Sequence, residues 1–85
     1  MKTFEYTIKD ELGIHARPAG LLAKKAKEFE SAVMLSKDGK TVNAARLIAV
    51  MGLGVKCGDT VSVTVEGADE ERAAKEMESF FSENL

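Results

Sequence analysis

His15 and Arg17 are the residues of this chain best suited to chemistry, and they stand two positions apart where a helical pattern begins. His15 is the only histidine, and a neutral imidazole is a good nucleophile that titrates near physiological pH. Arg17 carries a planar, permanently charged guanidinium that matches the geometry of phosphoryl oxygens. This pair predicts a site that takes a phosphoryl group onto His15.

The only proline, Pro18, indicates where that helix begins. Proline fixes φ and lacks an N–H group, so it suits the first turn of a helix and no later part of it. We predict a helix from Ala16 to Lys27, and the restriction on the residue before a proline leaves a start beyond Arg17 open. With either start, His15 stands beside the unpaired N–H groups and the positive dipole of the first turn, which favour an anion.

These residues also allow a plainer interpretation, and the residues alone leave both open. A lone histidine ahead of a helix is often a cap or a surface residue, and a nearby arginine is often solvated. A stripe on the same helix is either a solvated face or a docking surface for acidic partners, and it consists of Arg17, Leu21, Lys24 and Lys27. Gly20, early in the helix, either relaxes the first turn or lets a partner approach the backbone.

Four segments are predicted to be strands, and in the first and last of them apolar and polar residues alternate, which is the pattern of half-buried strands. They lie at 3–8, 33–36, 41–42 and 60–66. Between the second and third segments, Asp38-Gly39 predicts a tight hairpin. The order β-α-β-β-α-β-α indicates a single α+β domain over residues 1–85, with one four-stranded antiparallel sheet covered by helices on one side.

Capping residues indicate where two further helices begin. Asn43 is a good N-cap for a short helix from Ala44 to Met51. Asp69 is placed to cap a long last helix. The core face of that last helix is expected to consist of Ala73, Met77, Phe80 and Phe81.

The short second helix cannot bury every face, because Val50 and Leu53 already point inward in this pattern. Its other apolar side chains are either core residues or an exposed patch that marks a partner surface. These side chains are Leu47, Ile48 and Met51.

Composition argues against several classes of function. The net charge is −2, whereas a nucleic-acid surface normally needs a concentrated basic excess. RNA-recognition domains share part of the strand and helix order, but they stack bases on aromatic residues, and Lys40-Thr41-Val42 offers none. One histidine and one cysteine cannot supply a structural zinc site.

No apolar segment follows Met1-Lys2. We therefore expect neither a signal peptide nor a membrane span, and we expect a cytoplasmic location. In that reducing compartment, Cys57 is expected to be a small, half-buried loop residue without a disulfide.

The segment Gly13-Ile14-His15-Ala16-Arg17-Pro18-Ala19 resembles the active-site signature of the HPr family, the histidine-containing phosphocarriers of the phosphoenolpyruvate-dependent sugar phosphotransferase system. The likeness continues in the family order and spacing over essentially the whole chain. Its further motifs are Gly39-Lys40-Thr41-Val42-Asn43, Val50-Met51-Gly52-Leu53-Gly54-Val55 and Gly67-Ala68-Asp69-Glu70.

This resemblance implies a fold, a reaction and partners. The fold would be an open-faced β-sandwich with strand order 1-4-2-3 and three helices on one face. His15 would accept a phosphoryl group on Nδ1 from phosphorylated enzyme I and pass it to the IIA domain of a sugar permease. Arg17 and the helix N-terminus at Ala16 and Pro18 would stabilise that group. The protein would be a monomeric phosphocarrier with no turnover of its own, no cofactor and no bound metal.

The resemblance also favours a partner surface on the short second helix. In the family, the corresponding side chains lie beside the histidine and meet partner proteins. The implied surface comprises Leu21, Lys24, Lys27, Arg46, Leu47, Ile48 and Met51. Many relatives carry a kinase-regulated serine at the position of Arg46, so this chain would lack that regulatory site. The alternative function is a regulatory binding protein of the same fold that acts by docking rather than in sugar transport.

Overall fold

One antiparallel sheet and three helices make up the structure, a computed structural model that describes all 85 residues. The elements follow the chain as β1 (Lys2–Thr7), α1 (Ala16–Ala26), β2 (Ala32–Lys37), β3 (Lys40–Asn43), α2 (Leu47–Gly52), β4 (Thr60–Glu66) and α3 (Glu70–Asn84). This order confirms the predicted succession of strands and helices.

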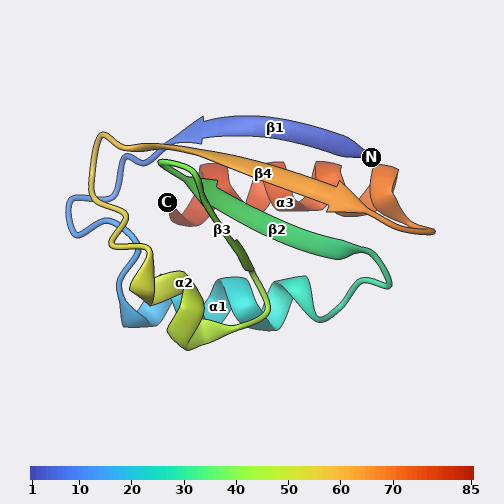
Figure 1. The fold of residues 1–85 in the computed structure, drawn as a ribbon, viewed down its shortest axis with the longest axis horizontal. Coiled ribbons are helices and arrows are strands. Elements are labelled where there is room, and N and C mark those ends of the chain that lie inside the picture. The colour runs from blue at the N-terminus through green and yellow to red at the C-terminus, as the bar shows by residue number, and fades with distance from the viewer.

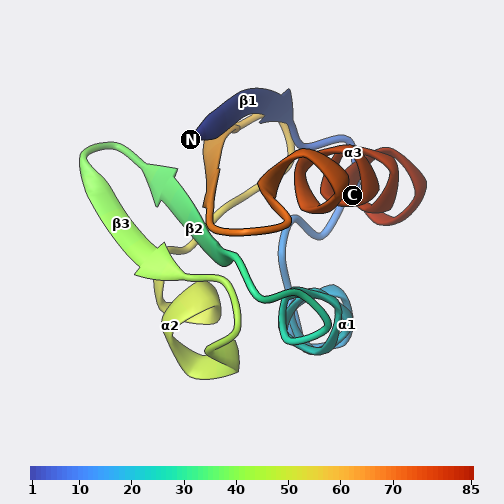
Figure 2. The ribbon, with the colours of Figure 1, turned by 90° about the vertical axis from the view of Figure 1, so that its right-hand side faces the viewer.

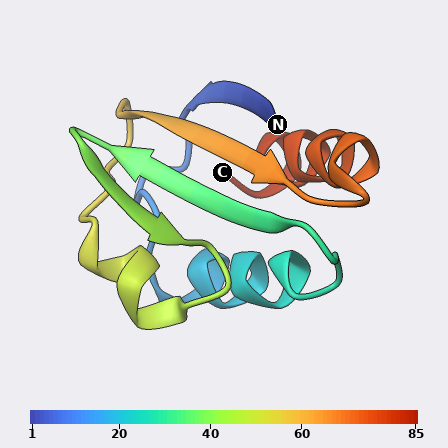
Figure 3. The ribbon, with the colours of Figure 1, turned by 45° about the vertical axis from the view of Figure 1, so that its right-hand side comes forward.

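The strands lie in the order β1-β4-β2-β3, and every neighbouring pair is antiparallel. The three helices cover one face of the sheet and leave the other face open (Figure 1, Figure 2). On the covered face, α3 contacts β1 and β4, whereas α2 contacts β3 and α1 (Figure 3). The open-faced sandwich implied by the resemblance is therefore confirmed.

A cluster of 19 buried apolar residues joins the sheet to the helices. Phe81 of α3 packs edge-on against two aromatic rings of β1, with centroid separations of 5.8 Å to Phe4 and 5.6 Å to Tyr6. Burial of a side chain of this size contributes about 1.5–3 kcal/mol, so this contact holds α3 on the sheet. Phe80, predicted for the core face, is only half-buried. The predicted alternation in β4 is confirmed, with buried Val61, Val63 and Val65.

The start of α2 differs from the prediction of a helix from Ala44 to Met51 capped by Asn43. The helix begins at Leu47 and ends at Gly52. Arg46 stands at its N-cap position with extended backbone angles, φ −106° and ψ 101°. The prediction of a short helix here was correct, but the predicted start at Ala44 was too early.

The sheet explains this later start. The N–H group of Ala44 donates to the carbonyl of Val33 at 2.8 Å, so the chain is still bonded to β2 at that point. The side chain of Asn43 accepts a hydrogen bond from the N–H of Ala45 at 2.8 Å. Asparagine forms such local turns as readily as it caps helices. The turn places Arg46, instead of Asn43, at the start of α2.

Cys57 is exposed, so the expectation of a half-buried residue was wrong. The neighbouring Gly58 donates its N–H to the carbonyl of Ile8 at 2.8 Å, which ties this loop to the end of β1 by its backbone. The exposed side chain of Cys57 adds only one long contact, from Sγ to the carbonyl of Lys9 at 3.8 Å. None of the three helices combines the length and the apolar character that crossing a bilayer requires.

Candidate functional site

His15 stands at the N-cap of α1. Its backbone is extended, with φ −101° and ψ −172°, and its side chain makes no capping hydrogen bond. The imidazole is 37% exposed. The predicted place of His15, directly ahead of the helix, is confirmed.

The first turn of α1 offers free N–H donors and no negative charge. The N–H groups of Ala16 and Arg17 precede the first internal hydrogen bond of the helix, and Pro18 has no N–H group. That first bond runs from the N–H of Ala19 to the carbonyl of His15, at 2.9 Å. No acidic residue lies in this turn. The partial positive charge of the helix end is therefore not neutralised by the turn itself.

The loop ahead of His15 is held by the loop that follows α2. The N–H of Ile14 donates to the carbonyl of Val55 at 3.1 Å. Gly13 has φ +69°, and a Cβ atom on it would lie 2.3 Å from that same carbonyl oxygen. A side chain at this position would therefore push the two loops apart and move His15.

A salt bridge in turn fixes the loop that follows α2. Nζ of Lys37 lies 2.9 Å from Oδ2 of Asp59 and donates to the carbonyl of Gly54 at 3.1 Å. The hydrogen bond from Lys37, together with one from the N–H of Lys56, lowers the pKa of Asp59. The carboxylate thus stays charged and keeps this supporting loop in place.

A cavity of about 210 Å³ opens beside His15. It lies between the start of α1, the preceding loop and the end of α3, and it is lined by Asp10, His15, Arg17, Pro18, Leu21, Glu83 and Asn84. Sequence reasoning missed three of these residues. No local pattern could have joined Glu83 and Asn84 to His15 across the chain. For Asp10, the one available signal was an acid in the loop that leads to the histidine.

The apolar residues predicted to meet partners are exposed. The exposed fractions are 43% for Leu21, 37% for Leu47, 79% for Ile48 and 39% for Met51, and we call these four residues the apolar patch. Their neighbour Val50 is fully buried, so α2 is divided between core and surface. The patch joins two helices that contact each other, α1 and α2.

The basic residues of the predicted surface are exposed as well, namely Arg17, Lys24, Lys27 and Arg46. Gly20 lies between them on α1, and a Cβ atom built on it would meet no other atom within 4 Å. The space over Gly20 is therefore open, as close approach by a partner requires.

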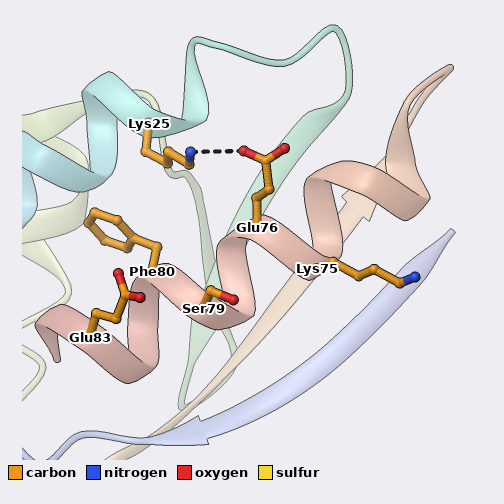
Figure 4. A pocket seen from close by; sticks show the side chains of 6 residues that line it. All are labelled: Lys25, Lys75, Glu76, Ser79, Phe80 and Glu83. Atoms are coloured by element: carbon orange, nitrogen blue, oxygen red, sulfur yellow. Dashed lines mark hydrogen bonds and ion pairs between the residues drawn. The ribbon is translucent and has the colours of Figure 1, made fainter.

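A second cavity of about 300 Å³ lies between α1 and α3, lined by Lys25, Lys75, Glu76, Ser79, Phe80 and Glu83 (Figure 4). Nζ of Lys25 is 2.9 Å from Oε1 of Glu76, and Lys75 points away from this pair (Figure 4). The Lys25 charge is thus neutralised within the chain. No group of three or more His, Cys, Asp or Glu side chains is arranged to hold a metal ion.

The chain is similar to known proteins over nearly its whole length. A family model described as PTS HPr component phosphorylation site matches residues 2–83. The phosphocarrier protein HPr of Lysinibacillus sphaericus is 41% identical over 83 residues, which cover 98% of this chain and 94% of that protein. A crystal structure of HPr-C-His from Thermoanaerobacter tengcongensis is 43% identical, with a TM-score of 0.88 and 100% of both chains covered. An HPr dimer from the same organism is 40% identical, with a TM-score of 0.77 and coverage of 98% and 95%.

Proposed function

This chain belongs to the HPr family and is a phosphocarrier of the phosphotransferase system, and from that premise we propose that His15 carries the phosphoryl group. The observation behind the proposal is the place of His15 at the N-cap of α1. Its imidazole is partly exposed and makes no capping hydrogen bond. The first turn beside it has free N–H donors and no acid. A phosphoryl group on His15 would meet positive potential as soon as it arrived.

The proposed reaction is an in-line displacement at phosphorus. The lone pair of Nδ1 attacks, a P–N bond forms, and the bond from phosphorus to the donor breaks. Arg17 lines the same cavity as His15, and its guanidinium stabilises the negative oxygens during transfer. The free N–H groups of Ala16 and Arg17 add to that stabilisation. Both contributions are electrostatic, so the group remains able to leave again.

The proposed partners are phosphorylated enzyme I as donor and IIA domains of sugar permeases as acceptors. The apolar patch would bury its exposed area in these contacts, and the basic residues Lys24, Lys27 and Arg46 would attract acidic partner surfaces. Arg46 cannot accept a phosphoryl group, so we infer that serine-directed regulation is absent at this position.

We further propose that the protein acts as a carrier and not as an enzyme, because one equivalent of phosphoryl group enters and leaves His15 without net turnover. We expect it to work as a cytoplasmic monomer, although a related HPr forms a dimer. Light scattering across a concentration series tests whether the protein is a monomer. A measured mass that rises to twice the chain mass would contradict the monomeric state.

The deciding experiment is labelling with radioactive phosphoenolpyruvate and purified enzyme I. We expect one phosphoryl group per chain, acid-labile as a P–N bond is, and none on His15→Ala. Acid-stable label, or label that survives in His15→Ala, would overturn the assignment. Circular dichroism of the variant confirms that the fold is intact.

A further inference from the structure

Asp10 lies in the loop ahead of α1, with its carboxylate beside the ring of His15. Oδ1 of Asp10 is 4.0 Å from Nε2 of His15, and the two side chains are 30% and 37% exposed, respectively. Nε2 is the ring nitrogen opposite Nδ1, which is the atom assigned above to the phosphoryl group. The carboxylate therefore faces the part of the ring that does not form the P–N bond.

The position of Asp10 is fixed without help from His15. Its N–H donates to the carbonyl of Leu85 at 2.9 Å, and its carbonyl accepts a hydrogen bond from the N–H of Gly13 at 2.9 Å. Its Oδ1 accepts a third bond from the N–H of Leu12 at 2.9 Å. Because three bonds hold the residue, the carboxylate is already in place before the histidine changes charge.

We propose that Asp10 is a positioning residue for phosphoryl transfer, which keeps the ring proton of His15 on Nε2 and stabilises the positive ring that forms when Nδ1 bonds to phosphorus. This inference rests on the proposed role of His15. A carboxylate that holds an imidazole in one tautomer and stabilises its cation acts in this way in other active sites. Contacts of this kind tighten when the reacting charge develops.

The proton on Nε2 matters in both directions of transfer. On acceptance, the neutral ring uses the lone pair of Nδ1, and the phosphorylated ring becomes positive. On donation, the P–N bond breaks, its electron pair returns to Nδ1, and a neutral imidazole leaves with its proton still on Nε2. Without that proton the leaving group would be an imidazolate anion, which is a much poorer one. Asp10 therefore favours loading as well as release.

Two other charged groups line the same cavity. Arg17 on α1 carries a positive charge, which opposes a positive ring, and Glu83 on α3 carries a negative one. Asp10 is the carboxylate that lies within ion-pair distance of Nε2. The test must therefore separate the contact of Asp10 from the effect of removing any one negative charge near the cavity.

The matched variants are Asp10→Asn and Glu11→Gln. Asp10→Asn keeps an oxygen that can accept the bond from Leu12 but loses the charge, and Glu11→Gln removes an equal charge from the exposed neighbour in the same loop. The probe is phosphoenolpyruvate with enzyme I, followed by removal of enzyme I and measurement of phosphoryl loss to water. A third measurement, nitrogen NMR of the unphosphorylated ring, reports which nitrogen holds the proton.

For Asp10→Asn we expect the rate of loading at saturating carrier to fall about two- to fivefold with an unchanged KM, as for a partly exposed ion pair. Phosphoryl loss to water should slow by a similar factor, and the NMR should show more proton on Nδ1. Glu11→Gln should match the parent protein. Unchanged NMR, unchanged rates, or an equal effect of Glu11→Gln would overturn the proposal. If the parent protein takes no label on His15, the proposed function fails instead, and the NMR still decides whether Asp10 sets the tautomer.

Discussion

Helices α1 and α3 both begin with unpaired backbone N–H groups. Only α3 has acids at its start, which offset the partial positive charge of these groups. α3 begins after Asp69 and carries Glu70 and Glu71 in its first turn, whereas α1 begins after His15 and has no acid there. A carboxylate near a helix N-terminus contributes about 0.3–1 kcal/mol to stability. The start of α1 lacks that contribution, and its positive end suits the anionic group proposed for His15.

The acids at the start of α3 are engaged within the chain. The carboxylate of Asp69 accepts hydrogen bonds from the N–H groups of Glu30 and Ser31 at 3.0 and 2.9 Å, and from the hydroxyl of Ser31. That hydroxyl is the main cause that lowers the pKa of Asp69 to about 2. Glu70 binds the N-terminal ammonium and the N–H of Gly67, which lower its pKa. The start of α3 thus joins elements of the fold, whereas the start of α1 has no acid in its first turn and is the place proposed for the phosphoryl group.

The largest effect is expected when α1 receives an acid in its first turn, as α3 has. Ala16→Asp places a carboxylate in the first turn of α1, where it would occupy the positive end of the helix and repel the incoming phosphoryl group. We expect labelling of His15 to slow about tenfold or more, while urea unfolding shows equal or slightly higher stability. Ala16→Asn is the neutral control of the same size. Equal labelling of the two variants would contradict the view that the free helix end matters.

An acid placed in the first turn of α2 distinguishes an effect on partner binding from an effect on folding. α2 also has no acid in its first turn, and Ile48→Asp would place one there in the most exposed residue of the apolar patch. We expect binding to enzyme I, measured by titration calorimetry, to weaken about tenfold, because a charge would be desolvated in the contact. The melting temperature should change little. A large loss of stability would show that Ile48 belongs to the core, and Val50→Asp provides that outcome as a reference.

Low pH should weaken the contacts that Asp69 makes at the start of α3. The pKa of Asp69 is lowered from 3.8 to about 2, so its stabilising contribution is complete above about pH 4 and is lost as pH falls toward about 2. We expect the urea midpoint of the parent protein to drop over that range, and Asp69→Asn to start lower and drop less. The other carboxylates with lowered pKa values are Asp59, Glu70 and Glu76, and the stability lost on their protonation is the same in both proteins. If the urea midpoints of the two proteins fell in parallel with pH, the role assigned to Asp69 would be contradicted. Labelling of His15 at neutral pH should be the same in both proteins.

The sequence predicted what depends on neighbours along the chain. Asp38 and Gly39 both have positive φ, 50° and 82°, as the predicted hairpin requires, and His15 precedes α1 because Pro18 suits only a first turn. Predictions failed where a residue had two possible partners. Asn43 forms a turn instead of a cap, because hydrogen bonds to β2 continue past it.

Other features depend on contacts between distant segments, which local patterns cannot report. Asp69 stands at the predicted N-cap of α3, but its carboxylate accepts no capping bond from an N–H group of that helix. It binds Ser31 instead, and within α3 only the side chain of Arg72. Glu83 reaches the cavity of His15 only because α3 ends there. The residues of the cavity that lie at the start of α1 were therefore predictable, whereas Asp10 in the preceding loop and the wall supplied by α3 were missed.

The smallest effect is expected at Arg46, which stands at the N-cap of α2 with its positive charge beside the positive end of the helix. Arg46→Ala should stabilise the helix slightly, by about 0.3–1 kcal/mol at most. The same change should weaken binding to an acidic partner about two- to fivefold, and added salt should reduce that difference. Opposite signs for folding and binding distinguish a docking residue from a neutral surface residue. Calorimetric titration with enzyme I at two salt concentrations, beside a melting curve, measures both, and unchanged binding at low salt would remove Arg46 from the docking surface.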